Sequence, residues 1–259
     1  MNLLPIDILE INQPLEKKTL ALLRGDASTF MIRRDGGYEK HFLALVKKLV
    51  KEKDYVVDMG ANLGYHTLTL AQQVGNQGRV YAFEPQRITF QQLNCNVFLN
   101  KLDNVYTYNA ALGETDGFAY IEQVDYYKEV PGSFGTNIGN TSLSLAATGD
   151  KIPRIALDSL NLPKLNFVKI DIQGCELLAL TGAKNTLLKH KPVLFVEIEE
   201  HHLVKFKTTP KMLIKFIKQL GYQMFQIKNE YPVDHLCLPE GHPPVDFGYE
   251  LVETKVPWF

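Results

Sequence analysis

The sequence predicts an α/β fold built on a mostly parallel sheet that has helices on both faces. In the stretch from Tyr55 to Thr67, β-branched Val56 and Val57 favour a strand, and glycines then lead into a helical pattern. Strand-like and helix-like segments alternate along the chain that follows, as they do in parallel sheets. The run from Pro192 to Glu199 is almost continuously apolar, which is typical of a strand that is covered on both faces.

Composition and charge limit the classes of protein that fit. The 259 residues are 45% hydrophobic and 22% charged, which is ordinary for a globular chain. The formal net charge of -1 provides no basic field for nucleic acid. Three widely spaced cysteines without a CxxC pair favour a reducing compartment over a disulfide framework or a zinc site. We read no signal peptide and no membrane-spanning run, so we expect a cytoplasmic protein without a membrane partner.

The N-terminal part is expected to differ from the rest. Residues 1 to about 35 show no regular pattern and are predicted to be irregular. From Tyr38 to Lys51, apolar residues recur at helical spacing, which predicts an amphipathic helix packed on the sheet, with a lid over a ligand as the alternative. We therefore divide the chain into an N-terminal segment and helix at residues 1–50 and a core domain at residues 51–259.

The core domain contains the remaining predicted elements. Strands are predicted at residues 79–85, 105–112, 118–124, 166–174, 192–199 and 222–227, with a further one near Leu236 or Tyr249. Helices are predicted at residues 88–99, 176–190 and 211–220. Residues 125–150 are rich in Gly, Ser, Thr and Asn and are predicted to form a loop insertion. Such a long loop is either functional or a solvated insertion.

Polar residues stand at the ends of the predicted parallel strands. Ligands of open parallel sheets bind at the carboxyl ends of the strands. Residues at these ends are therefore candidates for a site, and most of them are acids: Asp58, Glu84, Asn109, Asp171, Glu197 and Glu199.

Glu84 gives the strongest indication of a ligand. It lies about 20 residues beyond Gly64, where an acid can accept both hydroxyl protons of a ribose. The turn Gly60-Ala61-Asn62-Leu63-Gly64 lacks the middle glycine that a pyrophosphate requires, and the chain has no P-loop. S-adenosylmethionine, which has a ribose, a carboxylate and an amine but no phosphate, fits better. Asp58 is then a candidate for its ammonium, directly or through water; the alternative is that both acids only cap turns.

Several stretches together resemble a known family over about residues 50 to 200. The sequence is similar to the FkbM family of S-adenosylmethionine-dependent methyltransferases in these segments: 57–67, 83–85, 96–100, 110–113, 142–143, 157–158, 169–176, 180–183 and 196–198. The Asp-x-Gly-Ala-Asn-x-Gly turn and the Lys-Ile-Asp-x-x-Gly-x-Glu run are the most specific of them. The family more often has Glu where Gln173 stands.

The resemblance implies a class I methyltransferase, Rossmann-like fold with seven strands, of which the last form an antiparallel hairpin. It also implies that the glycine turn lines the cofactor, that Glu84 binds the ribose and that residues 110 and 111 lie near the adenine. We predict a cofactor site made of Asp58, Gly60, Asn62, Gly64, Tyr65, His66, Thr67, Glu84, Pro85, Ala110, Ala111 and Asp171. Family members mostly methylate hydroxyl oxygens, often of sugars or polyketide-like metabolites.

Methyl transfer to an alcohol benefits from a base that removes the hydroxyl proton. Asp171, at the end of a central strand, is the first candidate; the alternative is that it only accepts amides of its own loop. Lys169 shares its face of the strand and is expected to pair with the acid or to orient the substrate. Glu197 follows the next strand and is a candidate for contact with the substrate.

Histidines provide the alternatives to a carboxylate base. His66 begins the first core helix near the cofactor, although we favour packing or backbone binding as its role. His201 and His202 follow Glu197, Glu199 and Glu200, a combination that suits a divalent metal. Two adjacent histidines point differently on a regular element, so we favour a solvated loop and predict no metal site.

The leading hypothesis is an S-adenosylmethionine-dependent O-methyltransferase that acts on a sugar, a glycan or another small metabolite. The alternatives are an RNA or protein methyltransferase and a catalytically inactive cofactor-binding module. The charge balance and the absence of an Asn-Pro-Pro-aromatic run disfavour nucleic acid as a partner. We expect a monomer or a homodimer.

Overall fold

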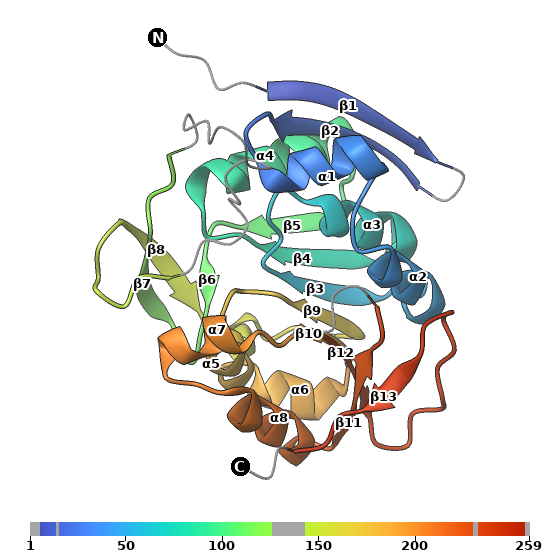
Figure 1. The fold of residues 1–259 in the computed structure, drawn as a ribbon, viewed down its shortest axis with the longest axis vertical. Coiled ribbons are helices and arrows are strands. Elements are labelled where there is room, and N and C mark those ends of the chain that lie inside the picture. Colours follow the sequence, from blue (N-terminus) through green and yellow to red (C-terminus); the bar gives the residue numbers. More distant parts are fainter. Residues whose placement is uncertain (1–5, 14–15, 126–142, 230–232, 257–259) are drawn as a thin grey trace.

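The computed structural model describes residues 6–13, 16–125, 143–229 and 233–256. In these residues a central eight-stranded sheet consists of β3 (Tyr55–Met59), β4 (Arg79–Phe83), β5 (Val105–Tyr108), β9 (Phe167–Ile170), β10 (Val193–Glu197), β11 (Tyr222–Ile227), β12 (Asp234–Pro239) and β13 (Leu251–Glu253). Their order across the sheet is β13-β11-β12-β10-β9-β3-β4-β5 (Figure 1). Strands β10, β9, β3, β4 and β5 are parallel, whereas β12, β11 and β13 pair antiparallel. The predicted fold class is confirmed, and β13 adds an edge strand to the seven that were expected.

Helices cover both faces of this sheet, because its buried strands alternate their side chains between two clusters. Val56 packs in one cluster with residues of α2 (Lys40–Leu49) and α3 (Tyr65–Val74). Helix α4 (Arg87–Leu99) packs on the same face through Leu93, which joins Ala82 of β4 in one cluster. Val57 packs in the other cluster with residues of α5 (Glu176–Thr181), α6 (Lys184–His190) and α8 (Pro210–Gln219). Every helix in the described chain is too short or too polar to cross a membrane.

The N-terminal region is regular, so the prediction of irregular structure up to residue 35 is wrong. Strands β1 (Ile6–Gln13) and β2 (Glu16–Leu23) form a two-stranded antiparallel sheet, which precedes α1 (Ala27–Asp35; Figure 1). Leu20 and Leu22 are buried against Leu68 of α3, and Ile32 of α1 joins the same cluster. Asp26 caps α1 by accepting the amide of Thr29 at 3.2 Å. The division at residue 50 stays a prediction.

Two predicted elements are interrupted. The predicted strand at 105–112 becomes β5 and a separate β6 (Ala111–Leu112), because the side chain of Asn109 turns to donate to the carbonyls of Glu84 and Pro85. The predicted helix at 176–190 divides into α5 and α6. There the carboxylate of Asp158 caps α6 by accepting the amides of Asn185 and Thr186.

A small three-stranded sheet lies beside the carboxyl ends of the parallel strands (Figure 1). It pairs β8 (Asp150–Ile155) with β6 and with β7 (Gly117–Ile121). Most of the loop insertion predicted at residues 125–150 lies outside the described residues. Helix α7 (Glu200–Leu203) and the short 3-10 helices at Leu157–Leu160 and Val204–Phe206 complete the described elements.

Candidate functional site

A cavity of about 400 Å³ lies where β3, β4, β9 and β10 end. Its walls come from the loops after these four strands, from α1 and the turn before α2, from β6 and from α7. Ten predicted residues line it: Gly60, Asn62, His66, Glu84, Pro85, Ala110, Ala111, Lys169, Asp171 and Glu197. Four predicted cofactor residues do not: Asp58, Gly64, Tyr65 and Thr67.

Close packing explains the two glycines of the turn after β3. Gly60 has a φ of 81°, and a Cβ there would stand 1.8 Å from the carbonyl oxygen of Asp171. The turn after β3 is therefore packed tightly against the loop after β9. Gly64 has a φ of 93° and begins α3, where a Cβ would meet Leu93 of α4 at 2.7 Å. Its role is helix packing rather than contact with the cavity.

Glu84 is a buried carboxylate in the cavity wall. One of its oxygens accepts the amide of Asn62 at 2.8 Å, and the other accepts the amide of Gln86 at 2.7 Å. A carboxylate oxygen has two lone pairs, so each oxygen keeps one for a ligand. Burial raises the pKa of Glu84 to about 7, while the two amides oppose this shift. Asn109, another residue at a strand end, bonds to backbone carbonyls and lies away from the cavity.

Asp58 does not line the cavity; its side chain shares the sheet face of Val56 and is directed toward α3. Its side chain is fully buried, and it accepts the hydroxyl of Thr67 at 2.6 Å. Its other oxygen lies 3.8 Å from Nζ of Lys169. Tyr65 is buried against Tyr38, with ring centroids 4.7 Å apart. Asp58 therefore lies behind the cavity wall, beside Lys169, and does not line the cavity itself.

Lys169, Asp171, Gln173 and Glu197 form a connected polar group. Nζ of Lys169 lies 3.0 Å from Asp171, so Lys169 pairs with the acid, one of its two predicted roles. The side-chain amide of Gln173 bridges the two acids, donating to Asp171 at 2.8 Å and to Glu197 at 3.0 Å. No role was predicted for Gln173, although it stands inside the Lys-Ile-Asp-x-x-Gly-x-Glu run.

These contacts set the charges of the group. Burial favours a neutral Asp171, but Lys169 and the hydrogen bonds from Glu197, Lys169 and Gln173 lower its pKa overall. Burial and the carboxylate of Asp171 raise the pKa of Glu197 well above its usual value. Burial alone lowers the pKa of Lys169, but the carboxylates of Asp171, Asp58 and Glu39 raise it overall. At neutral pH the group therefore contains an ionised Asp171, a protonated Glu197 and a charged Lys169.

The rest of the motif shapes the loop after β9. Glu176 accepts the amides of Ile172 and Gly174 with one carboxylate oxygen, at 3.2 and 3.0 Å. Gly174 has a φ of 106°, and a Cβ there would lie 2.4 Å from the carbonyl oxygen of His202. The loop that carries Asp171 is thus held by Glu176 from within and by α7 from outside.

His66 lines the cavity together with residues that the sequence analysis missed. Its Nε2 lies 2.9 Å from Glu39, which precedes α2, and its ring packs against Tyr38 and Phe42. Tyr38, Glu39 and two residues of α1, Ser28 and Met31, line the cavity. No sequence signal identified them, because they belong to the region that was expected to be irregular or to pack on the sheet.

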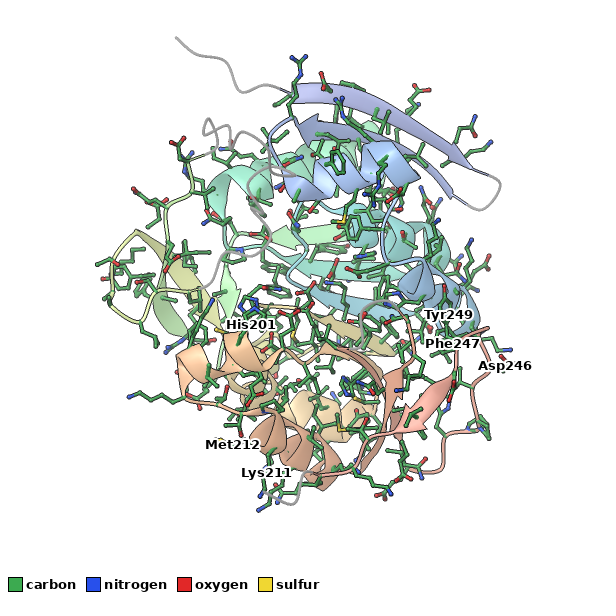
Figure 2. All side chains as sticks on the ribbon, viewed as in Figure 1. His201, Lys211, Met212, Asp246, Phe247 and Tyr249 are labelled. Atoms are coloured by element: carbon green, nitrogen blue, oxygen red, sulfur yellow. The ribbon has the colours of Figure 1, made fainter. Side chains whose placement is uncertain are left out.

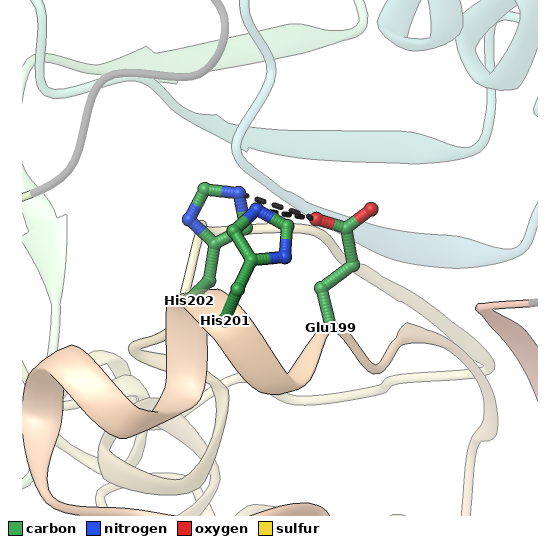
Figure 3. Close-up of side chains that lie close together, drawn as sticks. All are labelled: Glu199, His201 and His202. Atoms are coloured by element: carbon green, nitrogen blue, oxygen red, sulfur yellow. Dashed lines mark ion pairs between the residues drawn. The ribbon is translucent and has the colours of Figure 1, made fainter.

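Glu199, His201 and His202 also line the cavity, and their side chains converge. Both Nε2 atoms approach the same oxygen of Glu199, at 3.3 Å from His201 and 3.2 Å from His202 (Figure 3). The two rings are 3.9 Å apart between centroids. Contrary to the expectation for adjacent histidines, the two rings do not point apart, because Glu199 precedes the short helix and both rings turn back toward it.

The chain matches the family model of the methyltransferase FkbM domain over residues 58–224. It is 28% identical over 183 residues to the hexuronic acid methyltransferase AglP of Haloferax volcanii, covering 70% of each chain. It is 24% identical over 150 residues to methyltransferase 1 of Beauveria bassiana, covering 51% of this chain and 59% of that one. A solved FkbM methyltransferase from Methylobacillus flagellatus KT has 20% identity and a TM-score of 0.49, covering 73% of this chain and 44% of that one. With most of its core domain inside the matched region, the chain belongs to the FkbM family of S-adenosylmethionine-dependent methyltransferases.

Proposed function

We propose that this methyltransferase transfers a methyl group to a hydroxyl oxygen of its acceptor. The acceptor is a sugar or glycan, or more broadly a small metabolite. The observation that carries the proposal is that Glu84, a buried carboxylate that would accept ribose hydroxyls, lines the same cavity as Asp171 and Glu197. A sugar acceptor is supported by the 28% identity to a hexuronic acid methyltransferase.

The residues present fit S-adenosylmethionine, which supplies an electrophilic methyl group on a sulfonium. Glu84 would accept hydrogen bonds from the ribose hydroxyls through the lone pairs that its two backbone amides leave open. Gly60 and Asn62 would border the methionine side, and Ala110 and Ala111 the adenine side. A cavity of about 400 Å³ is within the usual range for such ligands.

Asp171 is our candidate for the group that receives the hydroxyl proton. It is ionised, lines the cavity and is oriented by Lys169 and Gln173. Its lowered pKa makes it a weak base, so proton transfer to it would come late in the reaction. Glu197, on the other side of Gln173, would contact the acceptor as a hydrogen-bond donor.

The test combines cofactor binding with methyl transfer to uronic acid-containing and neutral oligosaccharides. Asp171→Asn should keep the affinity for S-adenosylmethionine near normal and reduce turnover by roughly 100-fold or more. Asp103→Asn, the same change at an exposed acid, is the matched control and should leave turnover unchanged. Normal turnover in Asp171→Asn would eliminate it as the base.

The same measurements separate the alternatives. Cofactor binding without a product on any sugar would favour an inactive binding module. Methyl transfer to RNA or protein but not to sugars would replace the proposed acceptor. A chain that does not bind S-adenosylmethionine at all would contradict the whole proposal.

A further inference from the structure

The side chains of Glu199, His201 and His202 form a compact group of potential metal ligands. One ligand atom from each residue lies within 4.8 Å of the others. The two histidine nitrogens stand 3.2 and 3.3 Å from one carboxylate oxygen. Two ligands of one ion lie about 3 Å apart when each bond is about 2.1 Å long. We propose that these three residues bind a divalent cation in the cavity wall, and that the cation holds oxygen atoms of the methyl acceptor.

The ligand types match this proposal. Two imidazoles and one carboxylate suit zinc, manganese, iron or cobalt and leave open coordination positions when they are the only protein ligands. His202 is 3% exposed at its side chain, whereas His201 is exposed. Figure 2 shows His201 at the end of the sheet toward which the parallel strands point. Because all three residues line the cavity, the open side of the ion would face it.

The group is held in a fixed position beside the proposed base. Glu199 precedes α7, and its carbonyl accepts the amides of His202 and Leu203 at 3.1 Å each. The carbonyl of His202 in turn packs against Gly174, in the same loop as Asp171. A shift of α7 would disturb both the ligands and the base, so the two are positioned together.

The charge of the cavity gives such a cation a function, and this step rests on the proposed transfer to a sugar hydroxyl. Five carboxyl groups line the cavity: Glu39, Glu84, Asp171, Glu197 and Glu199. Of these, Glu197 is protonated and adds no negative charge. Lys169 is the one lysine or arginine among the lining residues that the structure describes, and Asp171 holds it. A divalent cation would bind a hydroxyl and a neighbouring carboxylate or hydroxyl of the sugar, and it would lower the pKa of the hydroxyl that is methylated.

One contact must change when the ion binds. Nζ of Lys205 lies 3.3 Å from Nδ1 of His202, and Lys205 is exposed. A cation on Nε2 leaves the ring proton on Nδ1, so the lysine has to turn away. Lys205→Met should therefore tighten cation binding or leave it unchanged, whereas loss of a ligand weakens it.

The experiment uses the full chain without an affinity tag, after removal of metals by a chelator. Manganese is titrated and its free ion is followed by electron paramagnetic resonance; cobalt absorption reports the ligand geometry. We expect one ion per chain, and a dissociation constant at least about tenfold weaker in His201→Ala and in Glu199→Gln. His242→Ala removes a partly exposed histidine elsewhere and should bind like the wild type. Equal binding in His201→Ala and the wild type, or no saturable binding, would overturn the site.

The role of the ion is tested separately from the proposed function. Binding of S-adenosylhomocysteine to the metal-free protein tests the cofactor site alone. Methyl transfer that stops with a chelator and returns with manganese supports the role in acceptor binding, whereas equal transfer in both conditions contradicts it. A protein that binds manganese through His201 but not the cofactor would sink the proposed function and leave the metal site standing.

Discussion

Glu84 illustrates how burial can make ligand binding depend on pH. The folded chain holds the proton of Glu84 up to about pH 7, whereas an unfolded chain releases it near the usual value of 4.5. The raised pKa therefore stabilises the unliganded fold at low pH, and this contribution is lost as the pH rises to about 7. Ribose hydroxyls, in contrast, bind best to the ionised carboxylate, because it offers only acceptors.

The affinity for S-adenosylhomocysteine should consequently rise between about pH 5.5 and about pH 7.5. Well below the pKa the slope should approach a factor of about ten per pH unit, because one proton must leave before the ligand binds. Isothermal titration calorimetry across this range is the measurement. Glu84→Gln should bind more weakly and lose most of the slope, and an unchanged slope in this variant would assign the dependence to another group.

Two asparagines, Asn96 of α4 and its C-cap residue Asn100, hold the N-terminal hairpin of β1 and β2. Asn100 accepts the amide of Thr19 at 2.9 Å and donates to its carbonyl at 2.7 Å. Asn96, one helical turn earlier, accepts the amide of Ala21 at 2.6 Å and donates to the carbonyl of Leu63 at 2.7 Å. Residues four apart on a helix and residues two apart on a strand are separated by similar distances. The two asparagine side chains can therefore hydrogen-bond to the backbone of Thr19 and Ala21 in β2, as a neighbouring strand would.

Asn96→Ala should loosen this attachment. It leaves the buried amide of Ala21 without its acceptor, which costs about 1–3 kcal/mol. Urea unfolding should show this loss, and hydrogen exchange should speed up across β1 and β2. Gln91→Ala, an exposed position on the same helix, is the control and should stay within about 0.5 kcal/mol of the wild type. Unchanged exchange in the hairpin would mean that α4 does not anchor it.

The parallel half of the fold could be predicted from the sequence, because its strands are apolar and its turns contain glycines. The hairpin did not, because a charge interrupts its pattern. Lys18 is buried in β2, where it bonds to the carbonyl of Tyr65 and the hydroxyl of Thr69 and lies over the ring of Tyr65. A lysine at a buried position hides the hydrophobic signal on which strand prediction depends.

The candidate site, like the fold, could be predicted only in part from the sequence. Residues at strand ends were found by their position, since a parallel sheet brings its carboxyl ends together. Orientation was not predictable: Asp58 stands on a strand facing α3, and Tyr38 and Glu39 reach the cavity from a distant segment. The convergence of His201 and His202 on Glu199 depends on the exact turn that begins α7, which periodicity does not determine.

The cavity draws most of its lining from three separate parts of the chain, residues 28–39, 60–86 and 169–202, and the remainder from Thr89, residues 110–112, Ile121 and Leu143. A ligand that fills it should stabilise the fold by about 2.7 kcal/mol at one hundred times its dissociation constant, since it binds only the folded chain. For a chain of this size the melting temperature should rise by about 5–10 °C. Hydrogen exchange with S-adenosylhomocysteine should slow in all three parts, and Glu84→Gln at the same ligand concentration should lose most of the effect. Slowing confined to residues 60–86 would show that the N-terminal elements and α7 do not enclose the cofactor. The walls that these elements supply would then be held in place by something other than the bound cofactor.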